Sequence, residues 1–254
     1  MSGIWADEAG DPDHPLLALI HGSMDRSAGM LKLSRQLDET FRVLRYDRRG
    51  YGRSFPHPGP FVIGDQVDDL VRLLAGRRAV LVGHSYGGNI ALAAAERHPD
   101  LVAGVAVYET PLSWESWWPR TTAGSVAVAG LGKTEDAAER FLRRTLGDQR
   151  WEALPERSKQ TRRAEGAAMV GELADVRRNR PWTAASITMP VVAAYGTLGA
   201  AHHQRGMKHA AELLGCPLVE LANCRHDAPL SHPALFRSAV IDPLLRTIGP
   251  PWSL

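Results

Sequence analysis

Short apolar runs alternate with amphipathic segments along the first half of the chain. Each run is four to six residues long, which suits a buried strand better than a helix. The predicted strands are residues 16–20, 41–46, 79–82 and 102–107, and the predicted helices between them are residues 26–37, 61–74 and 86–97. This alternation predicts βαβ crossovers, and therefore a mostly parallel sheet that is covered by helices on both faces.

The strand pattern stops between Pro111 and Met189, where residues 135–146 and 161–178 have the spacing of amphipathic helices. Strand and helix patterns then return at residues 191–195, 204–214, 218–221 and 233–248. We therefore predict one α/β core, made of residues 1–110 and 190–254, that is interrupted by a helical cap at residues 111–189.

Composition and charge narrow the class of protein. The 254 residues are 44% hydrophobic and 23% charged, which is typical of a globular domain that folds without help from disulfides or metals. Thirty basic residues against 28 acidic ones give a net charge of +2, too balanced for a protein that binds nucleic acid. We expect neither a signal peptide nor a membrane segment, and hence a cytoplasmic protein.

The cysteine pattern also excludes several kinds of site. Cys216 and Cys224 are the only cysteines, they form no CxxC pair, and no Cys/His spacing matches a zinc site. The sequence therefore predicts no disulfide framework, no metal and no organic cofactor. It leaves open whether the chain forms a homo-oligomer.

The segment Gly83-His84-Ser85-Tyr86-Gly87-Gly88 follows a predicted strand and precedes a predicted helix. A G-x-S-x-G motif in this setting forms a turn so tight that its flanking positions tolerate only small residues, and it exposes the serine hydroxyl. The start of the helix also places backbone N–H groups beside that hydroxyl, where they favour a developing negative charge. Ser85 is therefore the candidate nucleophile.

Three further motifs accompany this turn: His21-Gly22-Ser23, Asp47-Arg48-Arg49-Gly50-Tyr51-Gly52-Arg53-Ser54 and Asn223-Cys224-Arg225-His226-Asp227. With them the chain resembles the α/β-hydrolase fold superfamily over residues 3–248. The resemblance implies an oxyanion hole made by the backbone N–H groups of Tyr86 and Ser23, with Met24 as the alternative to Ser23. It also implies that residues 4–8 form the second of the usual eight strands, so that the first is absent.

A serine nucleophile needs a histidine within hydrogen-bond reach. His226 follows the last predicted strand, where the family places its base, whereas His232 in Ser231-His232-Pro233 is typical of the first turn of a helix. We predict His226 as the base and keep His232 as the alternative. His84, His202 and His203 are interpreted as structural, the last two at the start of a solvent-facing helix.

The acid that orients the histidine departs from the commonest family pattern. In most relatives it follows the strand at residues 191–195, but residues 196–201 contain no carboxylate here. The next place from which the fold can supply one is the end of the strand at 102–107, which carries Glu109. Zearalenone-lactonase-like members use a Glu at this place, so the resemblance favours Glu109. The alternatives are Asp227, Glu220, or a Ser85–His226 dyad in which water takes the place of the acid.

The predicted cap begins with a cluster of tryptophans. Trp114 and Trp117, with Trp118 beside them, are expected to line an apolar pocket whose floor Met24 and Tyr86 complete. The alternative is that these rings attach the cap to the core. The pairs Arg143-Arg144, Arg162-Arg163 and Arg177-Arg178 are interpreted as a solvated helix face, with a binding site for an acidic substrate as the alternative.

These residues predict a serine hydrolase that acts on a carboxylic ester or lactone of a small, largely apolar substrate. Hydrolysis of a C–C bond or cofactor-free perhydrolysis uses the same triad and stays open, as does a non-catalytic binding or signalling role on this fold. Ser85 in place of an Asp nucleophile argues against haloalkane dehalogenase and epoxide hydrolase chemistry.

Overall fold

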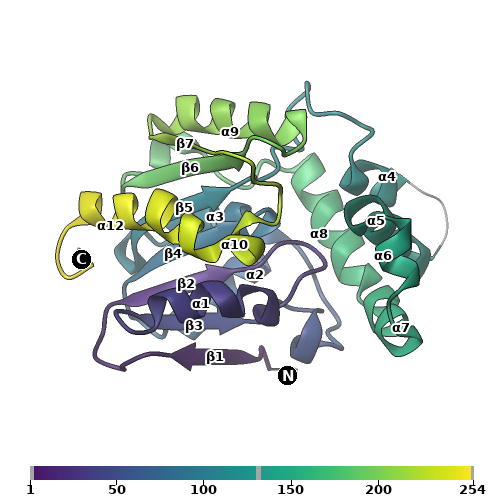
Figure 1. Ribbon diagram of the computed structural model, residues 1–254, viewed down its shortest axis with the longest axis horizontal. Helices are drawn as coiled ribbons and strands as arrows, with labels where there is room; N and C mark the ends of the chain where they lie inside the picture. The colour runs from purple at the N-terminus through teal and green to yellow at the C-terminus, as the bar shows by residue number, and fades with distance from the viewer. Residues whose placement is uncertain (1–2, 130–132, 253–254) are drawn as a thin grey trace.

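A seven-stranded sheet forms the centre of the computed structural model, which describes residues 3–129 and 133–252 (Figure 1). The strand order is β1-β3-β2-β4-β5-β6-β7. The strands are β1 (Ala6–Ala9), β2 (Leu16–Ile20), β3 (Arg42–Tyr46), β4 (Ala79–His84), β5 (Val102–Tyr108), β6 (Val191–Gly196) and β7 (Leu218–Leu221). Only β1 runs antiparallel, against β3, and every other pair is parallel, so the predicted mostly parallel sheet is confirmed.

Helices cover both faces of this sheet, as predicted. On one face lie α1 (Leu31–Leu37), α11 (Pro233–Phe236) and α12 (Asp242–Ile248), and on the other lie α2 (Ile63–Leu74), α3 (Tyr86–Arg97) and α9 (Ala201–Leu214). Because side chains alternate along a strand, Leu17 and Leu19 of β2 pack against the first set while Leu16, Ala18 and Ile20 pack against the second. Two hydrophobic clusters therefore hold the sheet from either side.

Shorter helical segments complete the core. These are the 3-10 helices η1 (Ser27–Met30), η2 (Gly52–Ser54) and η3 (Pro99–Leu101), the short helix α10 (Ala228–Ser231) and the π-helical segment η5 (Arg237–Ile241). The prediction of one helix over residues 233–248 was wrong in this detail, because η5 interrupts it. The interruption lies directly before Pro243, whose ring nitrogen cannot donate a helical hydrogen bond.

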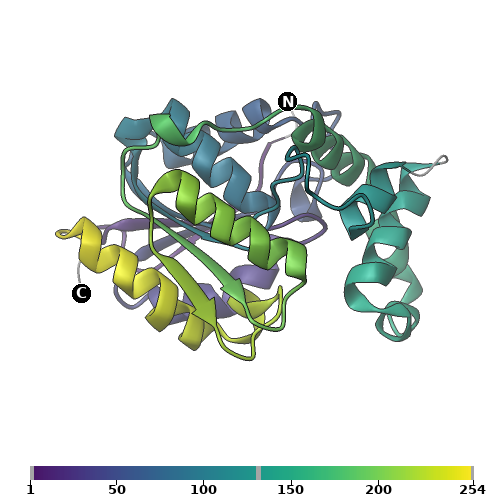
Figure 2. The ribbon, with the colours of Figure 1, turned by 90° about the horizontal axis from the view of Figure 1, so that it is seen from above.

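Between β5 and β6 the chain forms helices and, within the described residues, no strand. We call residues 111–189 the helical insertion; it contains α4 (Ala123–Ala129), α5 (Thr134–Leu146), α6 (Asp148–Glu152), α7 (Glu156–Ala164), α8 (Gly166–Arg178) and η4 (Ala184–Ser186). Figures 1 and 2 show its helices α4 to α8 beyond the edge of the sheet toward which the parallel strands run. In the described ranges, no helix has the length and apolar character needed to cross a membrane.

The predicted helix over residues 161–178 is divided between α7 and α8. The buried Glu165 side chain accepts hydrogen bonds from Arg26 and from the backbone N–H of Gly52, which fixes the chain at this point. A Cβ atom at Gly166 would collide with the backbone of Thr134 on α5. The break therefore lets the insertion contact both the core and its own neighbouring helix.

Arg48, from the Asp47–Ser54 motif, ties the helical insertion to the core. Its guanidinium is buried and lies 2.6 Å from a carboxylate oxygen of Glu172 on α8. It also donates to the carbonyl oxygens of His21 and Gly22, each at 3.0 Å. Since the backbone N–H of Arg48 donates to His21 Nε2, the motif holds neighbouring loops in place rather than supplying a reacting group.

Candidate active site

Ser85 lies at the turn between β4 and α3, in a backbone conformation that few residues adopt. Its φ is 53° and its ψ is −124°, and its backbone N–H donates to the Tyr108 carbonyl at 2.8 Å. Side chains are excluded beside it, since a Cβ atom at Gly87 would collide with the carbonyl of Ile20 and one at Gly88 with Thr110. The sequence motif thus forms the tight turn that exposes a serine at the start of a helix.

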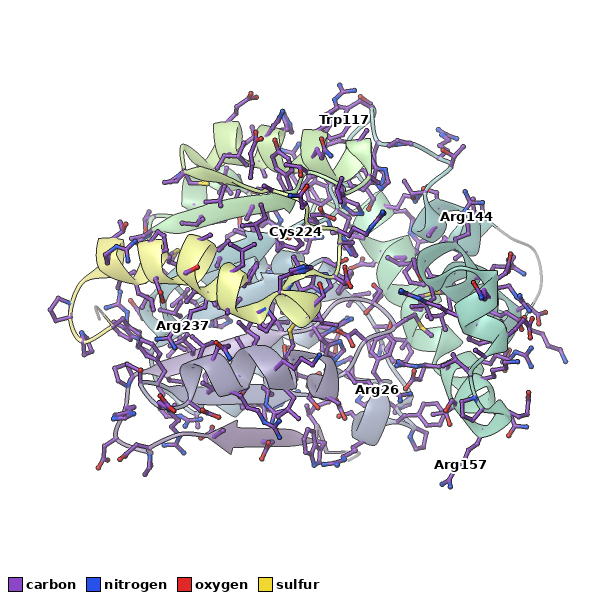
Figure 3. All side chains as sticks on the ribbon, in the orientation of Figure 1. Arg26, Trp117, Arg144, Arg157, Cys224 and Arg237 are labelled. Carbon is purple, nitrogen blue, oxygen red and sulfur yellow. The ribbon has the colours of Figure 1, made fainter. Side chains whose placement is uncertain are left out.

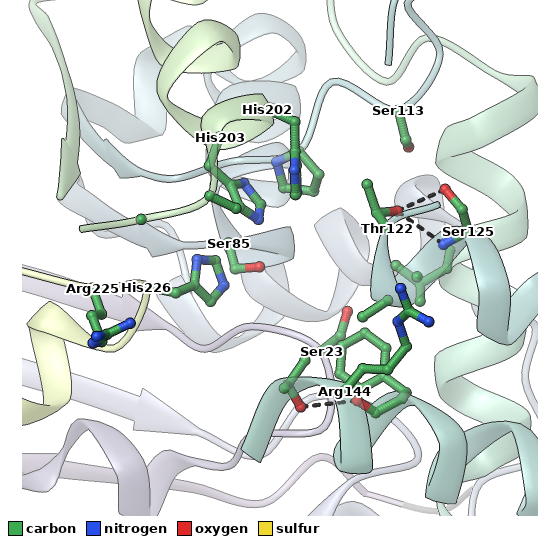
Figure 4. A pocket seen from close by; sticks show the side chains of 18 of the residues that line it. Ser23, Ser85, Ser113, Thr122, Ser125, Arg144, His202, His203, Arg225 and His226 are labelled. Carbon is green, nitrogen blue, oxygen red and sulfur yellow. Dashed lines mark hydrogen bonds between the residues drawn. The ribbon is translucent and has the colours of Figure 1, made fainter. Parts of the chain in front are cut away.

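The Ser85 hydroxyl points into a cavity beside the ring of His226 (Figure 4). Among the described residues it makes no hydrogen bond, so the hydroxyl is free to meet a substrate. Catalytic serine–histidine hydrogen bonds are often long without a bound substrate and shorten when one binds.

Glu109 orients His226. The Nδ1–H of His226 donates to Oε2 of Glu109 at 2.6 Å, and the other oxygen, Oε1, accepts the backbone N–H of Gly196 at 3.0 Å. Glu109 is fully buried and has a left-handed φ of 45°, at the end of β5. Because Nδ1 faces Glu109, Nε2 is the ring nitrogen left to face the cavity.

The loop after β6, where most relatives carry the acid, is shaped around Glu109 instead. A Cβ atom at Gly199 would collide with Oε1 of Glu109, so the glycine leaves space for this carboxylate. Neither alternative carboxylate has a hydrogen bond to His226 among the described residues: Asp227 lines the cavity but is exposed, and Glu220 is exposed on β7. The exposed His232 contacts the hydroxyl of Ser231 at 2.8 Å. The geometry brings together the three residues chosen from the sequence, and their catalytic roles stay predictions.

The loop of His21 to Met24 passes directly against the nucleophile, since a Cβ atom at Gly22 would lie 3.0 Å from Cβ of Ser85. The Gly22 carbonyl accepts from Arg48 in the core. In a trans peptide the following N–H points the opposite way, so the N–H of Ser23 points away from this core contact. Ser23 lines the cavity, which suits the predicted oxyanion role.

Met24 and Tyr86 differ from their predicted places on the pocket floor. The Met24 side chain is buried and lines a second, smaller cavity of about 350 Å³ that also contacts Ser85. The Tyr86 side chain points into the core, where its ring lies 4.8 Å from the Arg48 guanidinium carbon. Tyr86 therefore offers its backbone N–H, and not its ring, to the site.

Three further histidines surround His226. The sequence interpretation missed this grouping. The His203 ring stacks on His226 with centroids 4.6 Å apart, His202 lies 4.4 Å beyond His203, and His84 lies 4.8 Å from His226. The interpretation of His202 and His203 as part of a solvent-facing helix was wrong, because the first turn of α9 faces the cavity (Figure 4). Their position just after β6 was the available signal, because parallel strands end at the site.

Burial keeps the neighbours of His226 uncharged. It lowers the pKa of His84 to about 3, with the nearby His226 as the second cause, and lowers the pKa of His203 well below the usual histidine range. The Nε2–H of His84 donates to the backbone carbonyl of His226 at 2.8 Å. A positive charge that forms on His226 is therefore met by neutral rings rather than by other cations.

The buried His84 predicts a loss of stability in acid. Its folded pKa lies below its unfolded value of 6.5, so the unfolded chain takes up a proton that the folded chain does not. This contribution is fully present above pH 6.5 and is lost as the pH falls toward 3; by pH 5 about 2 kcal/mol of it has been lost. Urea unfolding at pH 8 and pH 5 measures it in wild type and His84→Gln.

Between pH 8 and pH 5, the free energy of unfolding of His84→Gln should fall by about 2 kcal/mol less than that of wild type. His232→Gln is the matched control, since this histidine is exposed, and it should behave as wild type. Equal pH dependence in wild type and His84→Gln would show that His84 is not buried as a neutral ring.

The main cavity has a volume of about 700 Å³, within the range of small-molecule sites. Trp118 lines it and contacts His202 and His203, but the expected Trp114 and Trp117 are not among the described residues that do. The Trp114 ring packs edge-on against Trp182, and Trp117 covers the outer side of α9 against Arg205 (Figure 3). These two rings hold the start of the insertion on the core.

One group of side chains has the composition of a metal site. The ligand atoms of Glu109, His203 and His226 all lie within 4.8 Å of one another. Because Glu109 and His226 already hydrogen-bond to each other at 2.6 Å, this arrangement suits an oriented base better than an ion cage. The expectation that no metal is used stays a prediction.

Comparison with known proteins identifies the family. A 98-residue segment, 37% of this chain, is 36% identical to 2-(acetamidomethylene)succinate hydrolase of Mesorhizobium japonicum and covers 35% of that protein. The matched segments span between 24% and 49% of the length of the curated relatives.

Solved structures of similar fold include a hydrolase from Pseudomonas aeruginosa PA01, with a TM-score of 0.75, 24% identity and coverage of 95% of this chain and 94% of that one. Another is the enol-lactonase from Burkholderia xenovorans LB400, with a TM-score of 0.72, 24% identity and coverage of 92% and 94%. At this identity the likeness shows the fold alone. A model of the alpha/beta hydrolase family matches residues 17–239, and the chain therefore belongs to that family.

Proposed function

We propose that this protein hydrolyses a small carboxylic ester or lactone through an acyl-enzyme on Ser85. The observation that carries the proposal is the Glu109–His226 hydrogen bond of 2.6 Å beside a free serine hydroxyl in one cavity. A buried carboxylate, an oriented imidazole and a serine that faces a cavity are the parts that nucleophilic acyl transfer requires.

In the proposed reaction Ser85 Oγ attacks the substrate carbonyl carbon while His226 Nε2 accepts the hydroxyl proton. Glu109 holds the Nδ1–H of His226 and stabilises the imidazolium that forms. The backbone N–H groups of Ser23 and Tyr86 bind the oxyanion of the tetrahedral intermediate. The alkoxide leaves with the proton from His226. Water then attacks the carbonyl of the acyl-enzyme while His226 accepts its proton, and His226 returns that proton to Ser85 as the acid is released.

The helical insertion fits the role of a cap in this proposal. Its residues Trp118, Thr122 and Phe141 line the cavity that contains Ser85, so substrate is enclosed between the insertion and the core. Enclosure excludes bulk water and strengthens the hydrogen bonds to the oxyanion.

Labelling with a fluorophosphonate probe tests the proposal without knowledge of the substrate. Such probes phosphonylate serines that a neighbouring base activates, so wild type should be labelled and Ser85→Ala should not. Ser116→Ala is the matched control, because Ser116 is exposed in the insertion, and it should label as wild type does. Wild type that stays unlabelled, or equal labelling of Ser85→Ala, would contradict the proposed function.

A further inference from the structure

The wall of the main cavity is positively charged. Four arginines line it, namely Arg144, Arg150, Arg177 and Arg225, and the only carboxylate among the described lining residues is that of Asp227. None of these arginines forms an ion pair with a described residue. The cavity therefore holds an excess of cationic groups.

Other arginines of the helical insertion form ion pairs. Arg143 on α5 pairs with Glu139, Asp148 and Glu152, and Arg163 on α7 also pairs with Glu139. Arg144, one residue after Arg143, makes no such pair within the described ranges. Arg144 is exposed, as the interpretation of a solvated face expects, and it also lines the cavity; the half-buried Arg177, which lines the cavity too, does not fit that interpretation.

Arg177, near the end of α8, is half-buried, whereas Arg144, Arg150 and Arg225 are exposed. Its Nη2 donates to the Ser125 hydroxyl, but its Nε is buried and has no hydrogen-bond partner among the described residues. Burial, followed by the nearby Arg120 guanidinium, lowers the pKa of Arg177. A cation in such surroundings gains free energy when an anion replaces the water it has lost.

Arg144 and Arg177 meet at one short segment of the insertion. Nη2 of Arg144 donates to the Thr121 carbonyl at 2.9 Å, and Arg177 donates to Ser125 four residues further on. Thr122 Oγ1 and Ser125 Oγ lie 2.6 Å apart between them. Figure 4 shows Thr122, Ser125 and Arg144 across the cavity from Ser85 and His226, so the two arginines face the part of a substrate remote from the reacting carbonyl.

We propose that the substrate carries a carboxylate, separate from the ester or lactone that is cleaved, and that Arg177 and Arg144 bind it. A planar guanidinium matches the two oxygens of a carboxylate, and Arg177 and Arg144 present two guanidinium groups at this segment. This inference rests on the proposed function and narrows the predicted largely apolar substrate to one with an anionic end.

Two matched pairs of esters test the inference. The first compares p-nitrophenyl hydrogen glutarate with p-nitrophenyl pentanoate, so that the charge lies on the acyl side. The second compares 4-acetoxybenzoate with 4-acetoxybenzamide, so that the charge lies on the alcohol side. Wild type should prefer the anionic member of at least one pair by about 10-fold or more in kcat/KM, and added salt should reduce the preference.

Arg177→Met should lower kcat/KM for the preferred anionic ester by about 10- to 100-fold and change the neutral ester less than about 3-fold. Arg177→Lys should restore part of the loss, and Arg144→Met should act in the same direction. Arg157→Met is the matched control, because Arg157 extends from α7 into solvent (Figure 3), and it should change neither ester.

A measurement on wild type alone covers the case in which a variant fails to fold. Glutarate should slow fluorophosphonate labelling of Ser85, and 1,5-pentanediol at the same concentration should not. No preference in either ester pair, together with no protection by glutarate, would overturn the inference. The proposed function would still stand in that case, provided that labelling depended on Ser85. Absence of labelling in wild type would instead overturn the proposed function.

Discussion

Replacement of Glu109 by Gln is expected to lower kcat by about 10⁴-fold, the effect of removing the charge of a triad acid. The amide has the same size as the carboxylate and occupies the same place at the end of β5. It can no longer stabilise the positive charge that forms on His226, and its NH₂ group favours the wrong tautomer of the imidazole. Steady-state hydrolysis of a p-nitrophenyl ester by wild type and variant measures the loss.

Asp227→Asn is the matched control for this experiment. Asp227 is the carboxylate adjacent to His226 on the chain, but it is exposed, whereas Glu109 is fully buried. The asparagine variant should stay within about 10-fold of wild type. Near-normal activity of a folded Glu109→Gln, with a large loss in Asp227→Asn, would assign the acid to Asp227.

Replacement of Ser85 by Ala should produce the largest effect, a loss of about 10⁶-fold in kcat. The hydroxyl is the only group of the site that forms a bond to the substrate in the proposed reaction. The oxyanion N–H groups of Ser23 and Tyr86 belong to the backbone and remain in the variant, so a small residual rate above that of water is expected.

The same ester assay, with circular dichroism to verify folding, measures this loss. Alanine and serine adopt the positive φ of 53° at position 85 with similar difficulty. The variant should therefore fold, and its free energy of unfolding should change only slightly. A folded Ser85→Ala that retains a tenth or more of the wild-type rate would show that another group is the nucleophile.

The strands and the tight turn at Ser85 could be predicted because their signals are local. Residues 16–20 and 218–221 are β2 and β7 without adjustment, since each is a short apolar run bounded by turn residues. Glu109 could be predicted because parallel strands end at one edge of the sheet, so a carboxylate after β5 reaches a histidine after β7.

What the sequence did not indicate depends on contacts between distant segments. His203 contacts His226 because the first turn of α9 lies beside the ends of the parallel strands. Helical spacing alone does not indicate which face of that turn packs against the core. Likewise, the i,i+4 spacing of Glu139 and Arg143 could be read from the sequence, but the contact of Arg144 with the Thr121 carbonyl beside the cavity depends on the packing of α5 against α4.

The break at Glu165 shows the same limit. Thr161 to Arg178 has continuous helical spacing, but Glu165 is held by Arg26 and Gly52, which lie more than a hundred residues away along the chain. Tertiary contacts of this kind override local helix preference. They also decide which tryptophans of the insertion reach the cavity, and only Trp118 of the three neighbours does.

Acid quenching during turnover of a p-nitrophenyl ester, followed by mass spectrometry of the digested protein, tests whether a covalent acyl-enzyme forms on Ser85. We expect a burst of p-nitrophenol close to one equivalent per active site when deacylation is slow, and an acyl group on the peptide that contains Ser85. Hydrolysis of the ester with no acyl group on that peptide, or with the acyl group on another residue, would contradict it.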